Sequence, residues 1–434
     1  MKSALPVKPP KWRMAVMGFP GHWRFMGPLT AARFQQLADL GFNAVILWVS
    51  QRVSASCRPG SKMEGIPDVP GRADWWAEPE TLDRIASIGE MARQSRLGLF
   101  ATLYACGGAQ TVGDISLPAA RSEEGAASKA ICPVASELWE EHLCRQALAW
   151  APHADGVLFD LEVQAGRDAA GAAYWKKHCC CERCLADFLG GRVAAEASAR
   201  PRLWLEQAGR WAAFVRHQEQ RAFGRVSAWR ASVRRVRPQA RVGFYGHTPG
   251  EDGWRINQIA RALYVEGSPI LLLDSATYWE SCVRRSPAPG KVRTTIWDWE
   301  KRQRAALRNL GVEAEICFGC FPGSPASNYS LKEIERHAFI SETCGEGYWV
   351  WNERRDPFEL QHAYQAANDW LNLAASRSEE FFNCVKDRVR CAEEQGFDTA
   401  FSLELLKRAE SCRASGDMKM AQIWAYQSSW SLGK

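Results

Sequence analysis

The 434-residue chain lacks several features that mark whole classes of protein. No run reaches about 18 uninterrupted apolar residues, so we expect no transmembrane helix and no membrane partner. The first residues lack the apolar core of a signal peptide, so no export is predicted. Charge of one sign does not predominate, because 55 Lys and Arg stand against 49 Asp and Glu and the net charge is +6. This balance does not favour nucleic acid as a partner.

Two further absences narrow the chemistry. No Gly-rich phosphate-binding turn follows the first apolar run, where Gly18, Gly21 and Gly27 do not have the spacing of a dinucleotide-binding loop. The eight histidines show no spacing that would bring three metal ligands together. A metal-dependent hydrolase with His178 or His247 on a catalytic ion therefore stays a secondary alternative.

Cysteine and tryptophan are both abundant. The 15 cysteines occur without an export signal, which favours reduced thiols with a metal site over a disulfide framework and predicts a cytoplasmic protein. The 20 tryptophans exceed ordinary usage. Some must belong to a core, but apolar faces of sugar rings also stack on exposed indoles, so the count suits a carbohydrate-binding cleft.

Short apolar runs alternate with longer amphipathic segments as far as Arg355. The predicted strands are Arg13–Gly18, Ala44–Val49, Leu97–Tyr104, Gly156–Glu162, Arg241–Tyr245, Ile270–Asp274, Ala314–Phe318 and Tyr348–Trp351. The predicted helices are Leu29–Leu40, Glu80–Arg93, Glu137–Ala151, Pro201–Arg235, Asp298–Leu310 and Leu331–Thr343. This alternation predicts an α/β fold, a (β/α)8 TIM barrel, with a doubly wound open sheet as the alternative.

The remainder of the chain is predicted to be wholly helical. Asp356-Pro357 suits a helix start, and Ser376-x-x-Glu379 has the pattern of a capping box. Two further helical stretches follow, at Ser402–Arg413 and Met418–Ser429. We therefore expect a barrel at residues 1–375 and a small helical extension at residues 376–434, which serves packing or the formation of a homo-oligomer.

Two carboxylates at the end of the fourth strand are the sharpest chemical feature. Asp160 and Glu162 lie two residues apart and so share one face of the strand. That face points toward the barrel mouth if Val157, Phe159 and Leu161 face the helices. Repulsion between the carboxylates should raise one pKa, which gives a proton donor beside a charged carboxylate, as glycoside hydrolysis requires. The alternative is a capping or salt-bridging role at a strand end.

The same stretch resembles the strand-four signature D-G-x-D-x-D-x-E of family 18 glycoside hydrolases, the chitinase type. Asp155, Gly156, Asp160 and Glu162 match, and Leu158 replaces the first interior Asp. The resemblance implies that Glu162 is the general acid/base and that Asp160 orients the substrate. The run from Asp274 to Trp279 is loosely similar to the Tyr region of that family's sixth strand.

A dense cysteine cluster follows the fourth strand. Cys179-x-Cys181-x-x-Cys184 places three thiols in one short segment, and close thiolates in a reduced compartment favour Zn²⁺ with four ligands. Cys132 is the first choice for the fourth ligand, followed by Cys180 or His178. Buried free thiols and a redox pair are the alternatives.

The cysteine spacing is similar to that of family 42 β-galactosidases and related barrel glycosidases. In that family a Cys-Pro before the third barrel helix joins a C-x-C-x-x-C segment followed by an aromatic residue, as Cys132-Pro133 and Phe188 do here. The resemblance implies a structural zinc on Cys132, Cys179, Cys181 and Cys184. The family's strand-four Asn-Glu pair is Leu161-Glu162 in this chain, and no Glu ends the seventh strand, where the family has its nucleophile.

Other candidate site residues lie at the carboxyl ends of strands, where barrel enzymes hold their active sites. Long loops also leave these ends, at Ser50–Glu78, Ala105–Ile131 and Val163–Arg200. Glu353 and Asp274 are candidates for a second catalytic carboxylate. The candidate substrate-binding residues are Trp48, Tyr104, Tyr245, His247, Tyr278, Trp279, Trp351 and Asn352.

Taken together, these patterns predict a glycosidase, a hydrolase of O-glycosyl bonds, with a carbohydrate substrate. It would act on an oligosaccharide or glycoside through Glu162, Asp160 and a second carboxylate, and a structural zinc would hold the strand-four loop. The alternative is a catalytically inactive carbohydrate-binding barrel.

Overall fold

The computed structural model of the chain describes residues 11–17, 29–48, 79–104, 111–112, 115–161, 178–246, 253–274, 296–320, 330–350 and 361–432. Eight parallel strands of these residues close into a barrel in the order β1-β12-β11-β10-β9-β8-β3-β2. The strands are β1 (Trp12–Met17), β2 (Ala44–Trp48), β3 (Gly98–Tyr104), β8 (Gly156–Asp160), β9 (Arg241–Gly246), β10 (Ile270–Asp274), β11 (Ala314–Cys320) and β12 (Gly347–Val350). The predicted (β/α)8 barrel is confirmed, and the open-sheet alternative is wrong.

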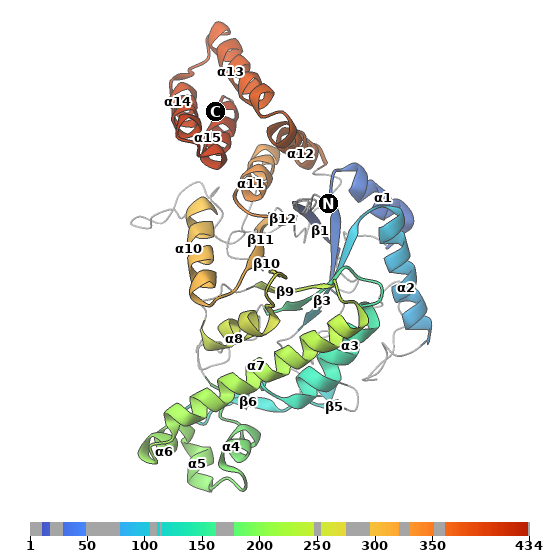
Figure 1. The fold of residues 1–434 in the computed structure, drawn as a ribbon, viewed down its shortest axis with the longest axis vertical. Coiled ribbons are helices and arrows are strands. Elements are labelled where there is room, and N and C mark those ends of the chain that lie inside the picture. Colours follow the sequence, from blue (N-terminus) through green and yellow to red (C-terminus); the bar gives the residue numbers. More distant parts are fainter. Residues whose placement is uncertain are drawn as a thin grey trace, which may run out of the picture.

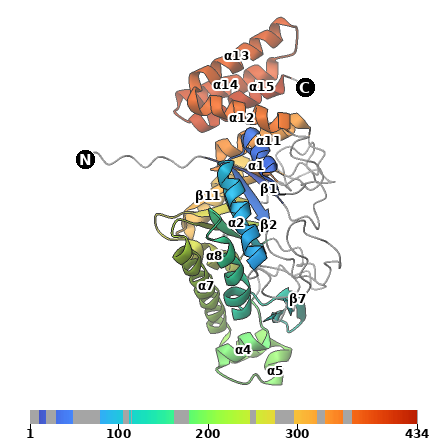
Figure 2. The same ribbon diagram turned by 90° about the vertical axis from the view of Figure 1, so that its right-hand side faces the viewer.

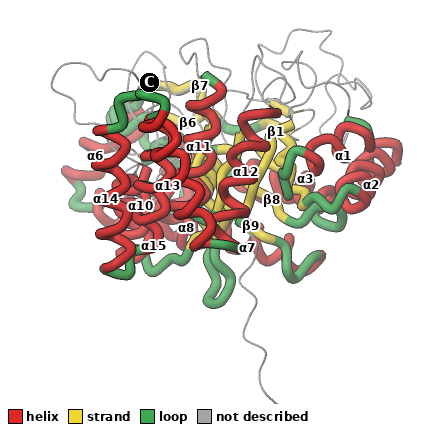
Figure 3. Tube along the Cα trace, turned by 90° about the horizontal axis from the view of Figure 1, so that it is seen from above, coloured by secondary structure: helices red, strands yellow, loops and turns green. Residues whose placement is uncertain are grey.

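Helices follow the strands and flank the barrel on both sides (Figures 1 and 3). Around the barrel they are α1 (Ala31–Asp39), α2 (Pro79–Gln94), η2 (Glu137–Leu143), α3 (Cys144–Trp150), α7 (Trp211–Val236), α8 (Trp254–Leu263), α10 (Ile296–Asn309), α11 (Leu331–Cys344) and α12 (Gln361–Ser376). The short helices α4 (Glu182–Leu189), α5 (Ala195–Ala199) and α6 (Pro201–Gln207) lie together at one end of the molecule. Two hairpins, β4–β5 (Thr111–Val112 with Ile115–Ser116) and β6–β7 (Ala119–Arg121 with Ala127–Ile131), interrupt the connection after β3.

Three details of the helix prediction are wrong. The single helix expected at Pro201–Arg235 is two, α6 and α7, because Gly209 adopts a φ of 65° that ends the first. Helix α8 was not predicted. No capping box occurs at Ser376, since that residue ends α12 and its hydroxyl donates to the carbonyl oxygen of Asn372. The capping box lies instead at the start of α11, between Ser330 and Glu333.

Alternation along the strands separates an inner from an outer core. The inner core fills the barrel and consists of Met14, Val16, Ala44, Ile46, Phe100, Leu158, Tyr245, Leu271, Leu273, Cys317 and Trp349. The intervening strand residues, such as Val157, Phe159 and Leu161, belong to the larger core between strands and helices. Both faces of the strands are therefore buried, as the continuous apolar runs predicted.

Polar groups close the amino-terminal end of the barrel. The indole of Trp12 donates a 3.1 Å hydrogen bond to the Glu315 carboxylate, which also pairs with Arg241 at 3.1 Å. These contacts close the amino-terminal end of the barrel beneath the apolar inner core, and the strands terminate at the opposite end.

The carboxyl-terminal helices form an extension beside the barrel. Helices α13 (Ser378–Glu394), α14 (Ala400–Ala414) and α15 (Met418–Ser431) lie at one end of the long axis in both views (Figures 1 and 2). The predicted helices at Ser402–Arg413 and Met418–Ser429 are thus confirmed. The predicted boundary between residues 375 and 376 falls at the last residue of α12, and the division into two domains stays a prediction. No helix within the described ranges is long and apolar enough to cross a membrane.

Candidate active site and metal centre

Asp160 ends β8 with its side chain on the inner face of the barrel. Leu158, two residues earlier, belongs to the inner core, whereas Val157, Phe159 and Leu161 pack toward the helices. Successive side chains of a strand alternate, so Asp160 shares the inner side with Leu158. Its side chain is buried, and the Leu161 amide that follows it donates to the Tyr245 carbonyl oxygen at 3.0 Å. The condition for this carboxylate to face the mouth is met.

Asp274 ends β10 with the opposite orientation. Leu271 and Leu273 fill the inner core, so Asp274 lies on the outer face with Leu272. Its carboxylate accepts hydrogen bonds from the Trp299 indole at 2.5 Å and from the Gln303 amide, both on α10. These bonds hold the Asp274 carboxylate against a helix, away from the barrel interior.

Tyr245 and two residues that the sequence analysis missed lie inside the barrel near Asp160. The Tyr245 ring packs edge-on against Trp349, with 5.1 Å between ring centroids. The Trp349 indole donates to the Asp274 carbonyl oxygen at 3.0 Å. Thr102 on β3 is fully buried, and its hydroxyl has no hydrogen-bond partner in the described part of the chain. A lone polar residue in the apolar run of β3 was the signal that could have identified Thr102.

Most other candidates lie outside the described residues. These are Glu162, His247, Tyr278, Trp279, Trp351, Asn352 and Glu353. Trp48 and Tyr104 are the last residues of β2 and β3, and only their backbone is described. The structure therefore brings together Asp160, Tyr245, Thr102 and Trp349, and it directs Asp274 elsewhere.

Four cysteines from two segments meet in one buried cluster. Cys132 follows β7, Cys179 and Cys181 precede α4, and Cys184 lies in its first turn. Their sulfur atoms all lie within 4.8 Å of one another, and Cys132 Sγ is 3.4 Å from Cys184 Sγ. A tetrahedral zinc with Zn–S bonds of about 2.3 Å separates its sulfur ligands by about 3.8 Å. The cluster therefore fits such an ion, and Cys132 is the fourth member in preference to Cys180 or His178.

The electrostatics of the cluster also suit a cation. Hydrogen bonds from Cys132, Cys179 and Cys184 hold the pKa of the Cys181 thiol far below its usual range. The pKa values of Cys132 and Cys184 are raised by hydrogen bonding with the other cysteines and by burial. One thiolate thus forms readily, while further ionisation in this buried space requires a positive charge. A dication bound to all four sulfurs supplies that charge.

His178 binds a carboxylate beside the cluster. The His178 backbone amide donates to Glu123 at 3.0 Å, its ring nitrogen Nδ1 lies 3.5 Å from the same oxygen, and Arg202 pairs with Glu123 at 2.9 Å. Burial alone would raise the pKa of Glu123, but the bonds from His178 and Arg202 outweigh it and lower the pKa to about 2. The His178 ring stacks on Trp254, the first residue of α8, at 4.6 Å. This contact joins the cysteine-bearing loop to the helix that follows β9.

Comparisons with known proteins give no information finer than the fold. No family model and no curated protein sequence matches the chain. Similar solved structures include the GH20 catalytic modules of a pneumococcal exo-β-D-N-acetylglucosaminidase, at 13% identity and a TM-score of 0.45, with 96% of this chain and 97% of that one covered.

Two further barrels are similar at the same level. A β-galactosidase from the psychrophilic Marinomonas ef1 has 12% identity and a TM-score of 0.49, with 85% of this chain and 61% of that one covered. A β-mannanase from the blue mussel Mytilus edulis has 12% identity and a TM-score of 0.39, with 79% and 84% covered. Similarity this distant says nothing about the reaction.

Proposed function

We propose that this chain is a glycoside hydrolase that acts on an oligosaccharide or glycoside. Glu162 is its general acid/base, and Asp160 is the partner that orients the substrate or stabilises charge. The observation that carries this proposal is the inward orientation of Asp160 at the carboxyl-terminal end of its strand, inferred from the alternation of Leu158 and Phe159. Barrel enzymes perform their chemistry at this end.

The proposed chemistry needs two carboxylates in different protonation states. Asp160 and Glu162 are two residues apart in the sequence, and a negative charge on one raises the pKa of the other. The protonated member donates its proton to the glycosidic oxygen, while the charged member stabilises the positive charge that develops on the sugar ring. Glu353 is favoured over Asp274 as a further carboxylate, because Trp299 and Gln303 already engage the Asp274 carboxylate on the outer face.

Aromatic residues of the mouth complete the proposed site. Trp48, Tyr104, Tyr278, Trp279 and Trp351 are proposed to stack on or border the sugar, with His247 and Asn352 as hydrogen-bonding groups. Tyr245 is almost fully buried against Trp349, so it is proposed to form the floor of the site beneath the substrate. Thr102, which pairs with Leu158 in the strand register, adds a buried hydroxyl that could hydrogen-bond within the barrel.

The proposed role of the metal is structural. Zinc on Cys132, Cys179, Cys181 and Cys184 would have four protein ligands and no open position for substrate, so when bound it supplies a cross-link. Contacts around the cluster would then help to fix the position of the strand-four loop beside the barrel. Glu123 holds His178, and His178 stacks on Trp254 at the start of α8.

The alternative function is a carbohydrate-binding barrel without catalysis, and one observation favours it. Leu158 is fully buried in the inner core, at the position where the similar family 18 motif has an Asp. Asp274 is also engaged, by α10. Neither position 158 nor Asp274 therefore offers a second carboxylate for catalysis. Such a barrel would bind sugar through its aromatic side chains and leave the glycosidic bond intact.

The test compares wild-type protein with Glu162→Gln on a panel of aryl glycosides. We expect hydrolysis of at least one substrate and a loss of about 10²-fold or more in the variant, the usual size of a lost general-acid step. Glu404→Gln, which alters an exposed carboxylate on α14, is the matched control and should retain full activity. Sugar binding without turnover by wild-type protein would support the alternative, and turnover indifferent to Glu162 would refute the assignment.

A further inference from the structure

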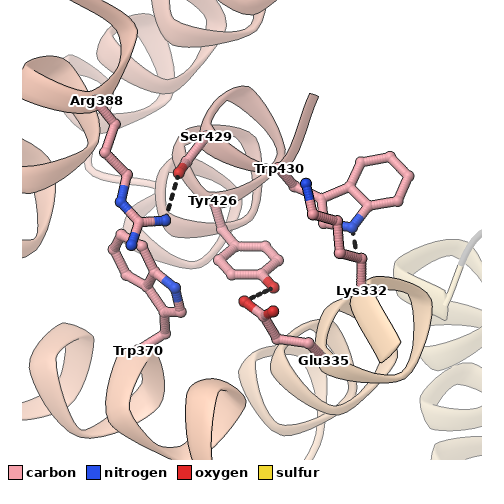
Figure 4. Close-up of a pocket in the computed structure, with 7 residues that line it drawn as sticks. All are labelled: Lys332, Glu335, Trp370, Arg388, Tyr426, Ser429 and Trp430. Carbon is pink, nitrogen blue, oxygen red and sulfur yellow. Dashed lines mark hydrogen bonds between the residues drawn. The ribbon is translucent and has the colours of Figure 1, made fainter. Parts of the chain in front are cut away.

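A small pocket of about 70 Å³ lies where the extension meets the barrel, apart from the strand ends and the cysteine cluster. Its walls come from α11, α12, α13 and α15 (Figure 4). The lining residues are Lys332, Glu335, Trp370, Arg388, Tyr426, Ser429 and Trp430. The proposed glycosidase chemistry uses none of them, so a ligand bound in this pocket would be independent of that chemistry.

Two cations converge on this pocket from opposite sides. Arg388 enters from α13, and its guanidinium lies over the Trp370 ring at 4.6 Å, while Lys332 enters from α11 beside Trp430. The Arg388 guanidinium donates a long hydrogen bond of 3.4 Å to the Ser429 hydroxyl. Within the described ranges, neither Lys332 nor Arg388 forms an ion pair. Most charged side chains of the neighbouring helices are paired, as Arg413 is with Glu379 and Lys386 with Glu410.

A single carboxylate stands between the two cations. Glu335 accepts a 2.9 Å hydrogen bond from the Tyr426 hydroxyl, which fixes its position on the pocket wall. Burial raises the pKa of Glu335, and the Tyr426 hydroxyl and the charges of Arg388 and Lys332 offset only part of this effect. With Glu335 ionised the lining keeps a net charge of +1, and with Glu335 protonated the net charge is +2. In either state a small anion would balance the surplus positive charge.

We propose that this pocket binds a small oxyanion, a phosphate or carboxylate group, between Arg388 and Lys332. Arg388 has guanidinium N–H groups to donate toward the pocket, and Lys332 has its ammonium group. The Ser429 and Tyr426 hydroxyls lie between them (Figure 4). A space of about 70 Å³ holds several water-sized groups, which is enough for a free phosphate ion or a single carboxylate group. Ligand bound here would also bridge α11 and α13 and so hold the extension against the barrel.

The test is calorimetric titration of the full chain at pH 7 and constant ionic strength, with inorganic phosphate, glucuronate and uncharged glucose as probes. We expect one anion site per chain. Arg388→Gln and Lys332→Gln should each weaken binding at least tenfold. Glu335→Gln should strengthen it several-fold, because it removes a like charge and keeps an oxygen for Tyr426. Arg390→Gln, an exposed arginine on the same helix, is the matched control and should leave affinity unchanged.

The outcomes separate the two sources of the anion. Binding of phosphate, alone or with glucuronate, supports a general oxyanion site, and binding of glucuronate alone supports an acidic sugar. Lys332 and Arg388 are both exposed, so neither substitution removes a buried side chain and both variants stay informative. The proposal is overturned if neither anion binds, or if affinity is the same in the Lys332 and Glu335 variants as in wild-type protein. Failure here leaves the Glu162 experiment unaffected.

Discussion

At the scale of single residues, alternate positions of a strand face the barrel interior or the surrounding helices, and this decides which groups a carboxylate can contact. Asp160 and Asp274 both end barrel strands, yet one faces the interior and the other faces α10. The sequence predicted the orientation of Asp160 only on the condition that Val157, Phe159 and Leu161 face the helices, and the fold meets that condition. The runs before Asp160 and Asp274 both lack a polar residue, so neither shows an alternation from which its inner face could be predicted.

The cysteine cluster was predictable from spacing, whereas the choice of its fourth member required the fold. Cys180 and His178 are close in sequence, but the Cys180 thiol donates to the His178 carbonyl oxygen and the His178 ring lies beside Glu123. We predict that Cys184→Ser abolishes zinc binding and lowers the free energy of unfolding by about 2–5 kcal/mol. Metal content by mass spectrometry and denaturant melts would measure both effects. Cys180→Ser is the control, since it should keep the ion. Wild-type protein purified under reducing conditions without zinc or another metal would contradict the proposed centre.

His337 should limit stability in mild acid. Burial lowers its pKa to about 4 in the folded chain, against about 6.5 when unfolded. Between these values the unfolded chain binds a proton that the folded chain does not. Stability should therefore decrease as pH falls from 6.5 to 4, by up to about 3 kcal/mol from this residue.

The variant His337→Gln isolates this effect, because an amide can still donate to the Gly319 carbonyl oxygen, as His337 does at 2.7 Å. Its free energy of unfolding should fall less steeply than that of wild-type protein across the same window. Urea melts at pH 7.5, 6, 5 and 4 would measure the difference. Parallel curves for the two proteins would show that His337 does not titrate as its burial requires.

At the scale of elements, strands were predicted better than helix ends. A buried strand is predicted from several successive apolar residues. A capping box depends on only one hydroxyl and one carboxylate, so its sequence pattern is less specific. The same Ser-x-x-Glu pattern occurs at Ser330 and Ser376, and only Ser330 forms the box. At Ser376 the preceding helix α12 is still in progress, so the hydroxyl bonds backward to Asn372 instead. Pattern alone could not distinguish a helix beginning from a helix ending.

We predict that Ser330→Ala lowers the free energy of unfolding by about 1 kcal/mol, because it removes the capping hydroxyl that accepts from the Glu333 amide. Ser376→Ala should change it by less than about 0.5 kcal/mol, since it removes no helix cap. Both variants can be compared by urea denaturation followed by circular dichroism. Equal effects of the two substitutions would mean that the capping box does not stabilise α11.

At the scale of the whole molecule, the helices of the extension were predicted, but their contacts with the barrel helices were not. Its contacts join residues far apart in sequence, which no local pattern encodes. Tyr426 of α15 stacks on Phe339 of α11 with 4.0 Å between centroids, and Phe381 of α13 packs edge-on against Trp370 of α12 at 5.6 Å. The barrel helices thus provide one wall of the extension's core, so the two parts should not unfold separately.

We therefore predict a single cooperative unfolding transition for the full chain, with barrel and extension melting together. Phe381→Ala should lower the free energy of that one transition by about 3–5 kcal/mol, since its ring is fully buried. Phe401→Ala on α14 is the control, because that ring is 66% exposed and its loss should cost less than about 0.5 kcal/mol. Calorimetry combined with circular dichroism would resolve the transitions. Two separate transitions, with only the smaller one shifted by Phe381→Ala, would show that residues 376–434 fold as an independent domain.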